Sequence, residues 1–459
     1  MGAAERARKR LVDALCASGS VHSPAVEEAF RAVPRHLFLP GRPVRAAYAD
    51  EAVAVQHVDG VATSSASQPS MMAIMLEQLD LRTGHRVLEV GAGTGYNAAL
   101  MAHLVGASGS VTAVDIDAEL VARAADNLAA AGLSGIDLHC ADGALGHPQR
   151  APYDRLILTV GSTDVRPEWV TQLAPGGRLL LPLSVRGSQL SVALDLSTGG
   201  ALRSHSVCSC AFIRLRGVGA GADLTIRLAT AGLVLQPVGD APVDPTAIDA
   251  ALADRGPMVP TAVSLSPADL WDGFGLYLAL TQPGTCRLLT SGPDAERAPE
   301  LIPIGTRHGT VALAGKCGLA AVVIDRNGAA ADAHPHVGVR AFGPGGPALV
   351  ERLITALDRW VAAERPNAAG LRLLIVPRSA AAEDGQARAT GPTTVFTEHC
   401  RIVADWEHLG QDPPAPGFTP PTPARTATPQ APQPGAAVGP PPSSSSHCRS
   451  GRRPAAPGR

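Results

Sequence analysis

The stretch that most constrains this chain covers residues 86–95, Arg-Val-Leu-Glu-Val-Gly-Ala-Gly-Thr-Gly. Its apolar first half predicts a buried parallel strand, in which Glu89 is the only acid. The alternating glycines Gly91, Gly93 and Gly95 predict a tight turn, because a residue without a Cβ lets a ligand and a following helix approach the backbone closely. This pattern is typical of a strand end that binds a nucleotide.

Strand-like and helix-like segments alternate on the C-terminal side of the glycine turn. Such alternation indicates an α/β fold with a doubly wound parallel sheet. The predicted helices cover residues 96–105 and 118–131, and the predicted strands cover residues 110–115, 136–140, 153–160, 177–183 and 190–196.

The length of 459 residues and a hydrophobic content of 45% leave room for two domains. Residues 1–217 carry the alternating pattern and form the first predicted domain. Residues 218–410 contain strand-like runs and one amphipathic helix over 349–361, which predicts a smaller C-terminal α+β domain. Residues 411–459 are rich in Pro, Ala, Thr and Ser, a composition that cannot offset the entropy lost on ordering, so they form a predicted disordered tail.

Charge and composition exclude several classes of protein. The net charge is −2 and the basic residues are scattered, which argues against a nucleic-acid or membrane-surface partner. Aromatic residues make up only 3% of the chain, whereas an enzyme that modifies nucleic acid would favour an aromatic stacking element. No apolar run reaches the roughly 18–20 residues of a membrane span, and no secretory signal is recognisable. The eight cysteines form no CxxC pair, so we expect a cytoplasmic protein with no metal site.

The spacing of the glycines narrows the choice of ligand. A dinucleotide fingerprint would place its third glycine where this chain has Tyr96, whereas the glycine is one residue early. A triphosphate-binding loop needs a Gly-Lys pair, and no lysine is nearby. A ligand with a ribose but no pyrophosphate fits better, and S-adenosylmethionine is such a ligand.

Two acids at the next strand ends support this interpretation. Asp115 ends the second predicted strand, where its carboxylate can accept hydrogen bonds from both ribose hydroxyls, each worth about 1.5–3 kcal/mol. Asp142 follows the third strand and is placed to accept from the adenine amine, and Gly143 leaves space for the ring. Either acid alone could be a loop or capping carboxylate, but three such strand ends in succession favour a cofactor site. The predicted cofactor-binding residues are Glu89, Gly91, Gly93, Gly95, Asp115, Asp142 and Gly143.

Residues 63–69, Thr-Ser-Ser-Ala-Ser-Gln-Pro, are predicted to form a hydroxyl-rich loop before a helix over 70–79. A serine-rich segment before a helix is usually only a cap region. Its place just upstream of the glycine turn makes a second role possible, at the acceptor side of the same site.

Six segments together resemble the protein-L-isoaspartate O-methyltransferase family, in that family's order over roughly residues 20–217. They are Val-Pro-Arg-His-Leu-Phe-Leu-Pro at 33–40, Ala-Tyr-Ala-Asp at 47–50, Ser-Gln-Pro at 67–69, Leu-Glu-Val-Gly-Ala-Gly-Thr-Gly-Tyr at 88–96, Asp-Gly at 142–143 and Leu-Ala-Pro-Gly-Gly-Arg at 173–178. The glycine motif is common to most class I methyltransferases, and the first and third segments are more particular to this family.

The resemblance implies a class I methyltransferase fold, S-adenosyl-L-methionine as cofactor, and protein or peptide substrates that carry isoaspartyl or aspartyl residues. The expected reaction esterifies the α-carboxyl of L-isoaspartyl or the β-carboxyl of D-aspartyl residues, and the ester then closes to a succinimide. Carried onto this chain, Ser67 is the expected active-site hydroxyl, accompanied by Thr63 and Ser65 in the enriched loop. Asp115 and Asp142 are expected to hold the cofactor.

Two departures from the family leave alternatives open. The loop at 63–69 is serine-enriched, and the chain continues beyond the family's usual length. Both features are similar to an actinobacterial subgroup that modifies aspartates in ribosomally made peptides such as lanthipeptides, in which the added domain would select the peptide. A repair enzyme, a dedicated peptide-maturation enzyme and an inactive binding module with this fold therefore remain as hypotheses.

The expected chemistry agrees with the residue types in the motifs. A carboxyl group has an unperturbed pKa near ~4, so it is already an ionised nucleophile at neutral pH and needs no general base. The site must instead orient and desolvate the carboxylate. Serine hydroxyls can do this by donating hydrogen bonds without reacting.

Overall fold

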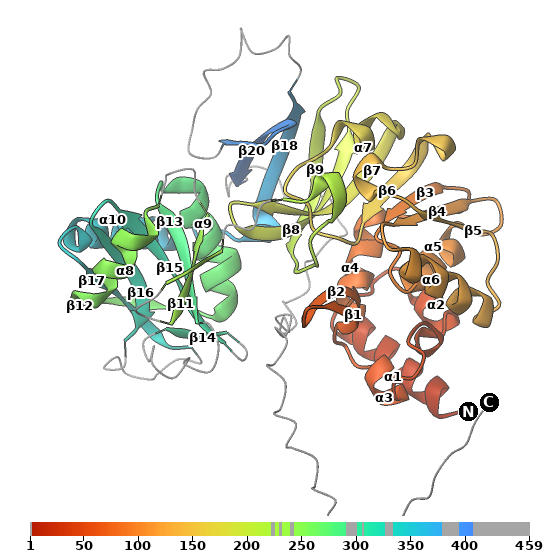
Figure 1. Ribbon diagram of the computed structural model, residues 1–459, viewed down its shortest axis with the longest axis horizontal. Coiled ribbons are helices and arrows are strands. Elements are labelled where there is room, and N and C mark those ends of the chain that lie inside the picture. The colour runs from red at the N-terminus through yellow and green to blue at the C-terminus, as the bar shows by residue number, and fades with distance from the viewer. Residues whose placement is uncertain are drawn as a thin grey trace, which may run out of the picture.

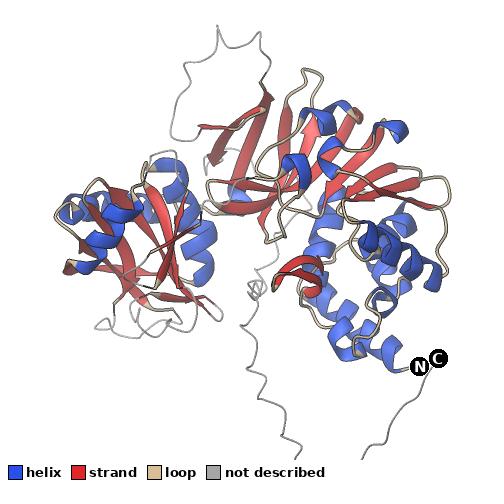
Figure 2. Ribbon diagram, in the orientation of Figure 1, coloured by secondary structure: helices blue, strands red, loops and turns tan. Residues whose placement is uncertain are grey.

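The computed structural model describes residues 2–221, 225–228, 232–238, 243–290, 301–304, 307–325, 334–378 and 394–406. The described chain forms a larger lobe with a ten-stranded sheet and a smaller lobe with an eight-stranded sheet (Figure 1). In each lobe, helices pack against the sheet (Figure 2). The predicted tail over 411–459 lies outside the described residues.

The sheet of the larger lobe has the order β19-β20-β18-β9-β8-β7-β6-β3-β4-β5. From β7 to β5 the strands are parallel, and from β8 to β19 they are antiparallel. The strands are β3 (Arg86–Val90), β4 (Ser110–Asp115), β5 (Ile136–Cys140), β6 (Tyr153–Leu158), β7 (Leu173–Val185), β8 (Ser188–Leu196), β9 (Leu202–Ser209), β18 (Leu371–Pro377), β19 (Thr394–Phe396) and β20 (Cys400–Trp406).

Alternate residues of the central strands enter two different cores. Val87 of β3 belongs to the core under the N-terminal helices, whereas Leu88 belongs to the core on the opposite face of the sheet. The sheet is therefore covered on both faces, which fits the unbroken apolar runs at residues 156–158 of β6 and 179–181 of β7. The helices of this lobe are α1 (Ala3–Ala17), α2 (Pro24–Ala32), α3 (Val44–Ala47), α4 (Pro69–Leu79), α5 (Tyr96–Val105), α6 (Ala118–Ala130) and α7 (Pro167–Thr171).

The predicted alternation of strands and helices is confirmed in the larger lobe, and the predicted loop over 63–69 is wrong in its first half. Residues up to Ala66 belong to β2 (Val61–Ala66), which pairs with β1 (Val53–Val58) in an antiparallel ribbon. The structural reason is that Val61 and Thr63 suit an extended backbone, and that Asp59 and Gly60, both with positive φ angles, form the two-residue turn that pairs this strand with β1. Only Ser67 and Gln68 link the strand to α4.

The second lobe is built on an antiparallel sheet, in keeping with the predicted α+β class. Its order is β10-β11-β13-β15-β16-β17-β12, and β14 pairs with β15. The predicted amphipathic helix is α10 (Gly346–Ala362), whose Trp360 is fully buried. The other elements are β10 (Ile226–Arg227), β11 (Leu233–Pro237), α8 (Pro245–Ala253), β12 (Arg255–Ser264), α9 (Phe274–Thr281), β13 (Thr285–Thr290), β14 (Ile302–Ile304), β15 (Arg307–Gly315), β16 (Gly318–Ile324) and β17 (His336–Phe342).

After the second lobe the chain returns to the sheet of the larger lobe. The last three strands, at residues 371–377, 394–396 and 400–406, therefore belong to that sheet, although the predicted division into residues 1–217 and 218–410 groups them with the second domain. Strand β18 pairs with β9, and β20 and β19 extend the sheet beyond it (Figure 1). Buried Asp164 holds this segment, because its carboxylate accepts from Thr397 Oγ1 at 2.5 Å and from the His399 amide at 2.8 Å. Such pairing between distant segments has no local signal in the sequence.

Helix α9 joins the cores of the two lobes. Its Leu276 and Leu280 belong to the core of the large sheet, whereas Phe274 and Leu278 belong to the core of the second lobe. All four are buried. No helix in the described part of the chain has the length and apolar character that crossing a membrane requires.

Candidate cofactor and acceptor pocket

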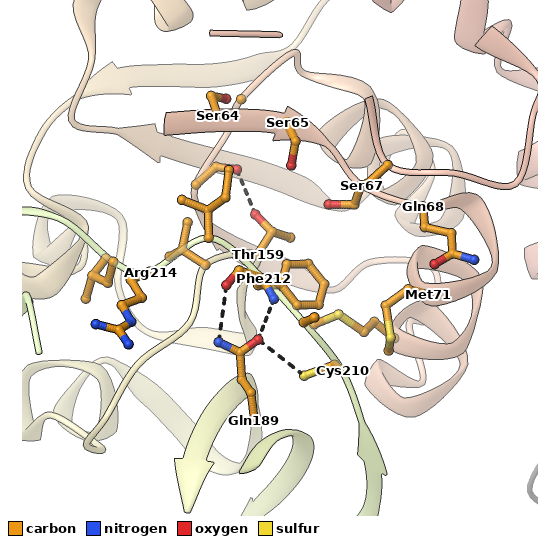
Figure 3. Close-up of a pocket in the computed structure, with 18 of the residues that line it drawn as sticks. Ser64, Ser65, Ser67, Gln68, Met71, Thr159, Gln189, Cys210, Phe212 and Arg214 are labelled. Carbon is orange, nitrogen blue, oxygen red and sulfur yellow. Dashed lines mark hydrogen bonds between the residues drawn. The ribbon is translucent and has the colours of Figure 1, made fainter. Parts of the chain in front are cut away.

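A cavity of about 410 Å³ lies where the glycine turn after β3, the end of β4 and the segment of Ser65 and Ser67 meet. Its size falls within the range of about 300–1,000 Å³ that is common for small-molecule sites. Its lining comes from both lobes, and Figure 3 shows the part contributed by the larger lobe.

The glycine turn has the backbone geometry that the sequence predicts. Gly91, Gly93 and Gly95 have φ angles of 100°, 52° and 84°, which only glycine adopts readily. A Cβ on Gly91 would lie 2.8 Å from Thr159 Oγ1, so that position has no room for a side chain. A Cβ on Gly95 would lie 3.3 Å from the Cβ of Ala124 in α6. Gly91 and Gly93 line the cavity, and the role of Gly95 is close helix packing.

Asp115 ties the end of β4 to this turn. Its Oδ2 accepts a 3.0 Å hydrogen bond from the Gly93 amide, and its Oδ1 accepts a 3.2 Å bond from the Asp117 amide. Burial raises the pKa of Asp115, and the hydrogen bonds and the Arg216 guanidinium oppose that rise. Arg216 Nη2 lies 3.8 Å from Oδ1. The carboxylate lines the cavity with its charge partly offset.

Glu89 is fully buried beneath the turn and also lines the cavity. Its Oε1 accepts from Asn97 Nδ2 at 2.8 Å, and its Oε2 has no hydrogen-bond partner among the described residues. Burial raises the pKa of Glu89 to about 8. A buried polar atom that lacks a partner is uncommon in native structures and is consistent with a ligand group beside it.

Of the pair at 142–143, the structure brings only Gly143 to the cavity wall. A Cβ on Gly143 would lie 2.3 Å from Val90 Cγ1, so the backbone packs directly on β3. Asp142 is not among the described lining residues. Its carboxylate accepts from the Ala144 amide at 2.9 Å and from the Val218 amide at 2.8 Å. Its predicted contact with adenine therefore stays a prediction, and it would require the Val218 contact to be shared or exchanged.

The predicted hydroxyl residues are divided between two positions. Ser65 and Ser67 point toward the cavity (Figure 3). Thr63 also lines it, but its hydroxyl donates to Gln56 Oε1 at 3.0 Å. Gln56 in turn donates to Asp117 at 2.7 Å, so this hydroxyl belongs to a network that supports the start of α6.

Arg35 and Asp50 hold the segment of Ser67, Gln68 and Ser70 in place. The sequence alone did not reveal this role. Buried Arg35 donates from Nη2 to the Ser67 carbonyl at 2.8 Å. Asp50 accepts from Gln68 Nε2 at 3.2 Å and from the Ser70 amide at 2.8 Å. Both residues lie in segments that carry the family resemblance, and that resemblance was the available signal.

Sequence reasoning missed the opposite wall of the cavity. Gln189 bonds both main-chain groups of Phe212, with its Nε2 donating to the Phe212 carbonyl at 3.3 Å and its Oε1 accepting from the Phe212 amide (Figure 3). Arg216 was also missed, since it lies far from the glycine turn in sequence. The described residues of the second lobe that line the cavity are Gln236, Pro267, Ala268, Trp271, Asp272, Arg287 and Leu289.

The residues present fit S-adenosylmethionine. The glycine turn leaves space for the ligand against the backbone, and Asp115 offers a carboxylate at the second strand end. Glu89 offers an oxygen that no described residue bonds. Beside them, Ser65 and Ser67 offer hydroxyl donors to a second ligand. The arrangement can hold a cationic adenosyl cofactor and a carboxylate acceptor in one cavity.

Comparison with known proteins gives the same family over the first half of the chain. Residues 6–219 match the family model "Protein-L-isoaspartate(D-aspartate) O-methyltransferase (PCMT)". The protein-L-isoaspartate O-methyltransferase of Methanopyrus kandleri is 39% identical over 213 residues, which are 46% of this chain and 92% of that protein. The Hyperthermus butylicus protein of the same name is 36% identical over 219 residues, covering 46% of this chain and 89% of its own. A solved structure titled protein-L-isoaspartate O-methyltransferase aligns with a TM-score of 0.45 at 24% identity, over 80% of this chain and 96% of its own.

Proposed function

The chain belongs to the protein-L-isoaspartate(D-aspartate) O-methyltransferase family, and from that membership we infer that its N-terminal half is an S-adenosylmethionine-dependent carboxyl methyltransferase. We propose that its acceptors are L-isoaspartyl and D-aspartyl residues of proteins or peptides. The observation that carries this proposal is that Asp115 lines the same cavity as Ser65 and Ser67.

Each part of the cavity has a task in this reaction. When bound, S-adenosylmethionine supplies a methyl group on a positively charged sulfur. Asp115 would hold the ribose, and the glycine turn would place the backbone against the cofactor. An oxygen of the acceptor carboxylate forms the new bond to the methyl carbon while the carbon–sulfur bond breaks, so the products are an ester and a neutral thioether.

The hydroxyls of Ser65 and Ser67 would orient the acceptor carboxylate by donating hydrogen bonds to it. The acceptor is ionised at neutral pH, so the chain needs no proton-abstracting group. The apolar side chains of Met71 and Phe212 line the same cavity and would exclude water from the carboxylate. Positioning and desolvation are thus the contributions we assign to the protein.

The direct test uses a synthetic peptide with one L-isoaspartyl residue and its normal aspartyl counterpart. The full chain and S-adenosylmethionine should give a methyl ester and the derived succinimide on the isoaspartyl peptide, detected by mass spectrometry. The normal peptide should remain unmodified. Retained cofactor binding without methyl transfer to any aspartyl or isoaspartyl peptide would identify an inactive binding module instead.

A second candidate is a dedicated methyltransferase that matures one ribosomally made peptide. The observation in its favour is that second-lobe residues such as Trp271 and Arg287 line the cavity, where they can contact a substrate. Methylation of an ordinary aspartyl residue in one such peptide, without activity on generic isoaspartyl peptides, would favour this narrower function.

A further inference from the structure

We propose that the second lobe forms part of the acceptor site, where Trp271 binds an apolar side chain next to the methylated residue of an extended polypeptide. This inference rests on the proposed carboxyl methyltransferase activity and adds to it a determinant of substrate choice. Trp271 lies in the short π-helical turn η5 (Asp269–Gly273), immediately before α9. It lines the same cavity as Ser67 and the glycine turn.

Trp271 is held against the larger lobe by a buried arginine. The guanidinium carbon of Arg287 lies 4.9 Å from the centre of the Trp271 ring. The same guanidinium donates to the Gly187 carbonyl at 2.5 Å and to Ser188 Oγ at 2.6 Å, both at the turn between β7 and β8. Because Arg287 is bonded across the boundary between the lobes, it places the indole relative to the larger lobe.

The wall that contains Trp271 continues into the acceptor side of the cavity. Ser188, which bonds Arg287, is followed directly by Gln189, which bonds Phe212. All four residues line the cavity. Helix α9 fixes the position further, since Leu276 packs in the core of the large sheet and Phe274 in the core of the second lobe. The second-lobe wall is therefore part of a rigid boundary of the pocket.

The chemistry of this wall suits an apolar side chain with a peptide group beside it. Pro267, Ala268 and Leu289 line the cavity with Trp271. The Trp271 Nε1 is buried and has no hydrogen-bond partner among the described residues, so it can donate to a main-chain carbonyl of the substrate. Burial raises the pKa of the nearby Asp272 carboxyl, and the Ser209 hydroxyl and the Arg287 guanidinium oppose that rise.

An acceptor that lies between the two lobes must be a chain segment rather than the surface of a folded protein. A cavity of about 410 Å³ has the size of a small-molecule site, so beside the cofactor it can admit a short substrate segment but not a folded surface. An aspartyl residue in an unfolded or flexible segment meets this condition. The side chain beside it would then contact Trp271.

The test uses two pairs of isoaspartyl peptides. In one pair leucine or glycine precedes the isoaspartyl residue, and in the other pair leucine or glycine follows it. The full chain should prefer one leucine peptide by about tenfold in kcat/KM, the low end of the effect of an added apolar group in a pocket. Trp271→Ala should reduce that preference to about twofold or less and leave the affinity for S-adenosylmethionine unchanged. The matched control is Trp406→Ala, which removes the same residue type from β20, outside the cavity lining.

A second variant keeps the proposal testable if loss of Trp271 disturbs folding. Ala268→Leu adds bulk to the same wall and should lower kcat/KM for the preferred leucine peptide more than for the glycine peptide. Equal methylation of leucine and glycine peptides by the unaltered chain would overturn the inference while the proposed activity stands. Failure to methylate any isoaspartyl peptide would overturn both.

Discussion

The Gly93 amide donates a 3.0 Å hydrogen bond to Oδ2 of Asp115 and so joins the glycine turn to the end of the neighbouring strand. The bond links two positions that are expected to contact the same ligand. The hydrogen bond fixes the strand end and the turn relative to each other, so the two can act as one preformed surface for the ligand. Cofactor binding and turnover should depend on this surface and on Ser65 and Ser67, which line the same cavity.

Replacing Asp115 with alanine should weaken S-adenosylmethionine binding by about 100-fold or more. The expected loss is that of two charge-assisted hydrogen bonds from the ribose hydroxyls, each worth about 1.5–3 kcal/mol. Isothermal titration calorimetry measures it directly. The control is Asp126→Ala, which removes an exposed carboxylate from the following helix. Unchanged binding by the Asp115 variant would refute the ribose assignment.

Replacing Ser67 with alanine should lower turnover on an isoaspartyl peptide by about 100-fold or less and leave cofactor affinity unchanged. A positioned donor acts on the reacting carboxylate, whereas the main-chain carbonyl of Ser67 keeps its bond from Arg35 in the variant. Single-turnover methyl transfer, with Ser65→Ala measured in parallel, separates the two hydroxyls. Full activity of the Ser67 variant would remove this residue from the mechanism.

Gly91→Ala should destabilise the fold more than Gly132→Ala does. Both glycines have positive φ angles, 100° and 71°, so both variants carry backbone strain of about 1–2 kcal/mol. At Gly132 nothing lies within 4 Å of an added Cβ, whereas at Gly91 that atom would lie 2.8 Å from Thr159 Oγ1. The extra cost should be about 1–3 kcal/mol in denaturant unfolding. Equal losses in the two variants would contradict the steric argument.

Glu89 should make the cofactor-free protein less stable as the pH rises. Burial raises the pKa of Glu89 to about 8 from the ordinary 4.5, so between these values the folded chain retains a proton that the unfolded chain has released. The free energy of unfolding contributed by this group is therefore fully present below the ordinary pKa and is lost as the pH passes through the folded pKa, by at most about 1.4 kcal/mol per pH unit.

Denaturant unfolding at about pH 5 and about pH 8 tests this dependence. The Glu89→Gln variant should show a smaller loss of stability over that interval than the unaltered chain. The exposed Glu119 of α6 offers the matched control, Glu119→Gln, which should keep the original dependence. The same pH dependence in the Glu89 and Glu119 variants would show that another group is responsible.

Local patterns in the sequence were sufficient to predict the central part of the larger lobe. The run from Arg86 to Val90, the following glycines and Asp115 each act through a few neighbouring residues, and the structure places Gly91, Gly93 and Asp115 at one cavity. Apolar periodicity likewise predicted α10, because its stripe repeats within a single helix.

Most of the unpredicted features depend on contacts between distant segments. The edge of the large sheet is completed by β18 after more than a hundred intervening residues. Strand β2 is different, because the Asp59-Gly60 turn that pairs it with neighbouring β1 is a local hairpin signal that went unused. Asp142 looked like a free strand-end carboxylate, but the structure supplies it with the Val218 amide. The place of Trp271 in the cavity depends on how the two lobes pack against each other. The contacts of β18, Asp142 and Trp271 leave no periodic or compositional mark.

The pairing of β9 with β18 has a consequence for how this architecture can be altered. Arg203 and Leu374 lie opposite each other in the register, so the polypeptide leaves the large sheet and re-enters it on neighbouring strands. The smaller lobe thus has the connectivity of an insertion whose two ends leave neighbouring strands of the large sheet. A linker that begins after Gly219 and ends at Leu371 could excise the lobe, keep every strand of the large sheet and retain Phe212 and Arg216 in the cavity lining. A foreign lobe grafted at the same two points would give the methyltransferase a new wall for its substrates.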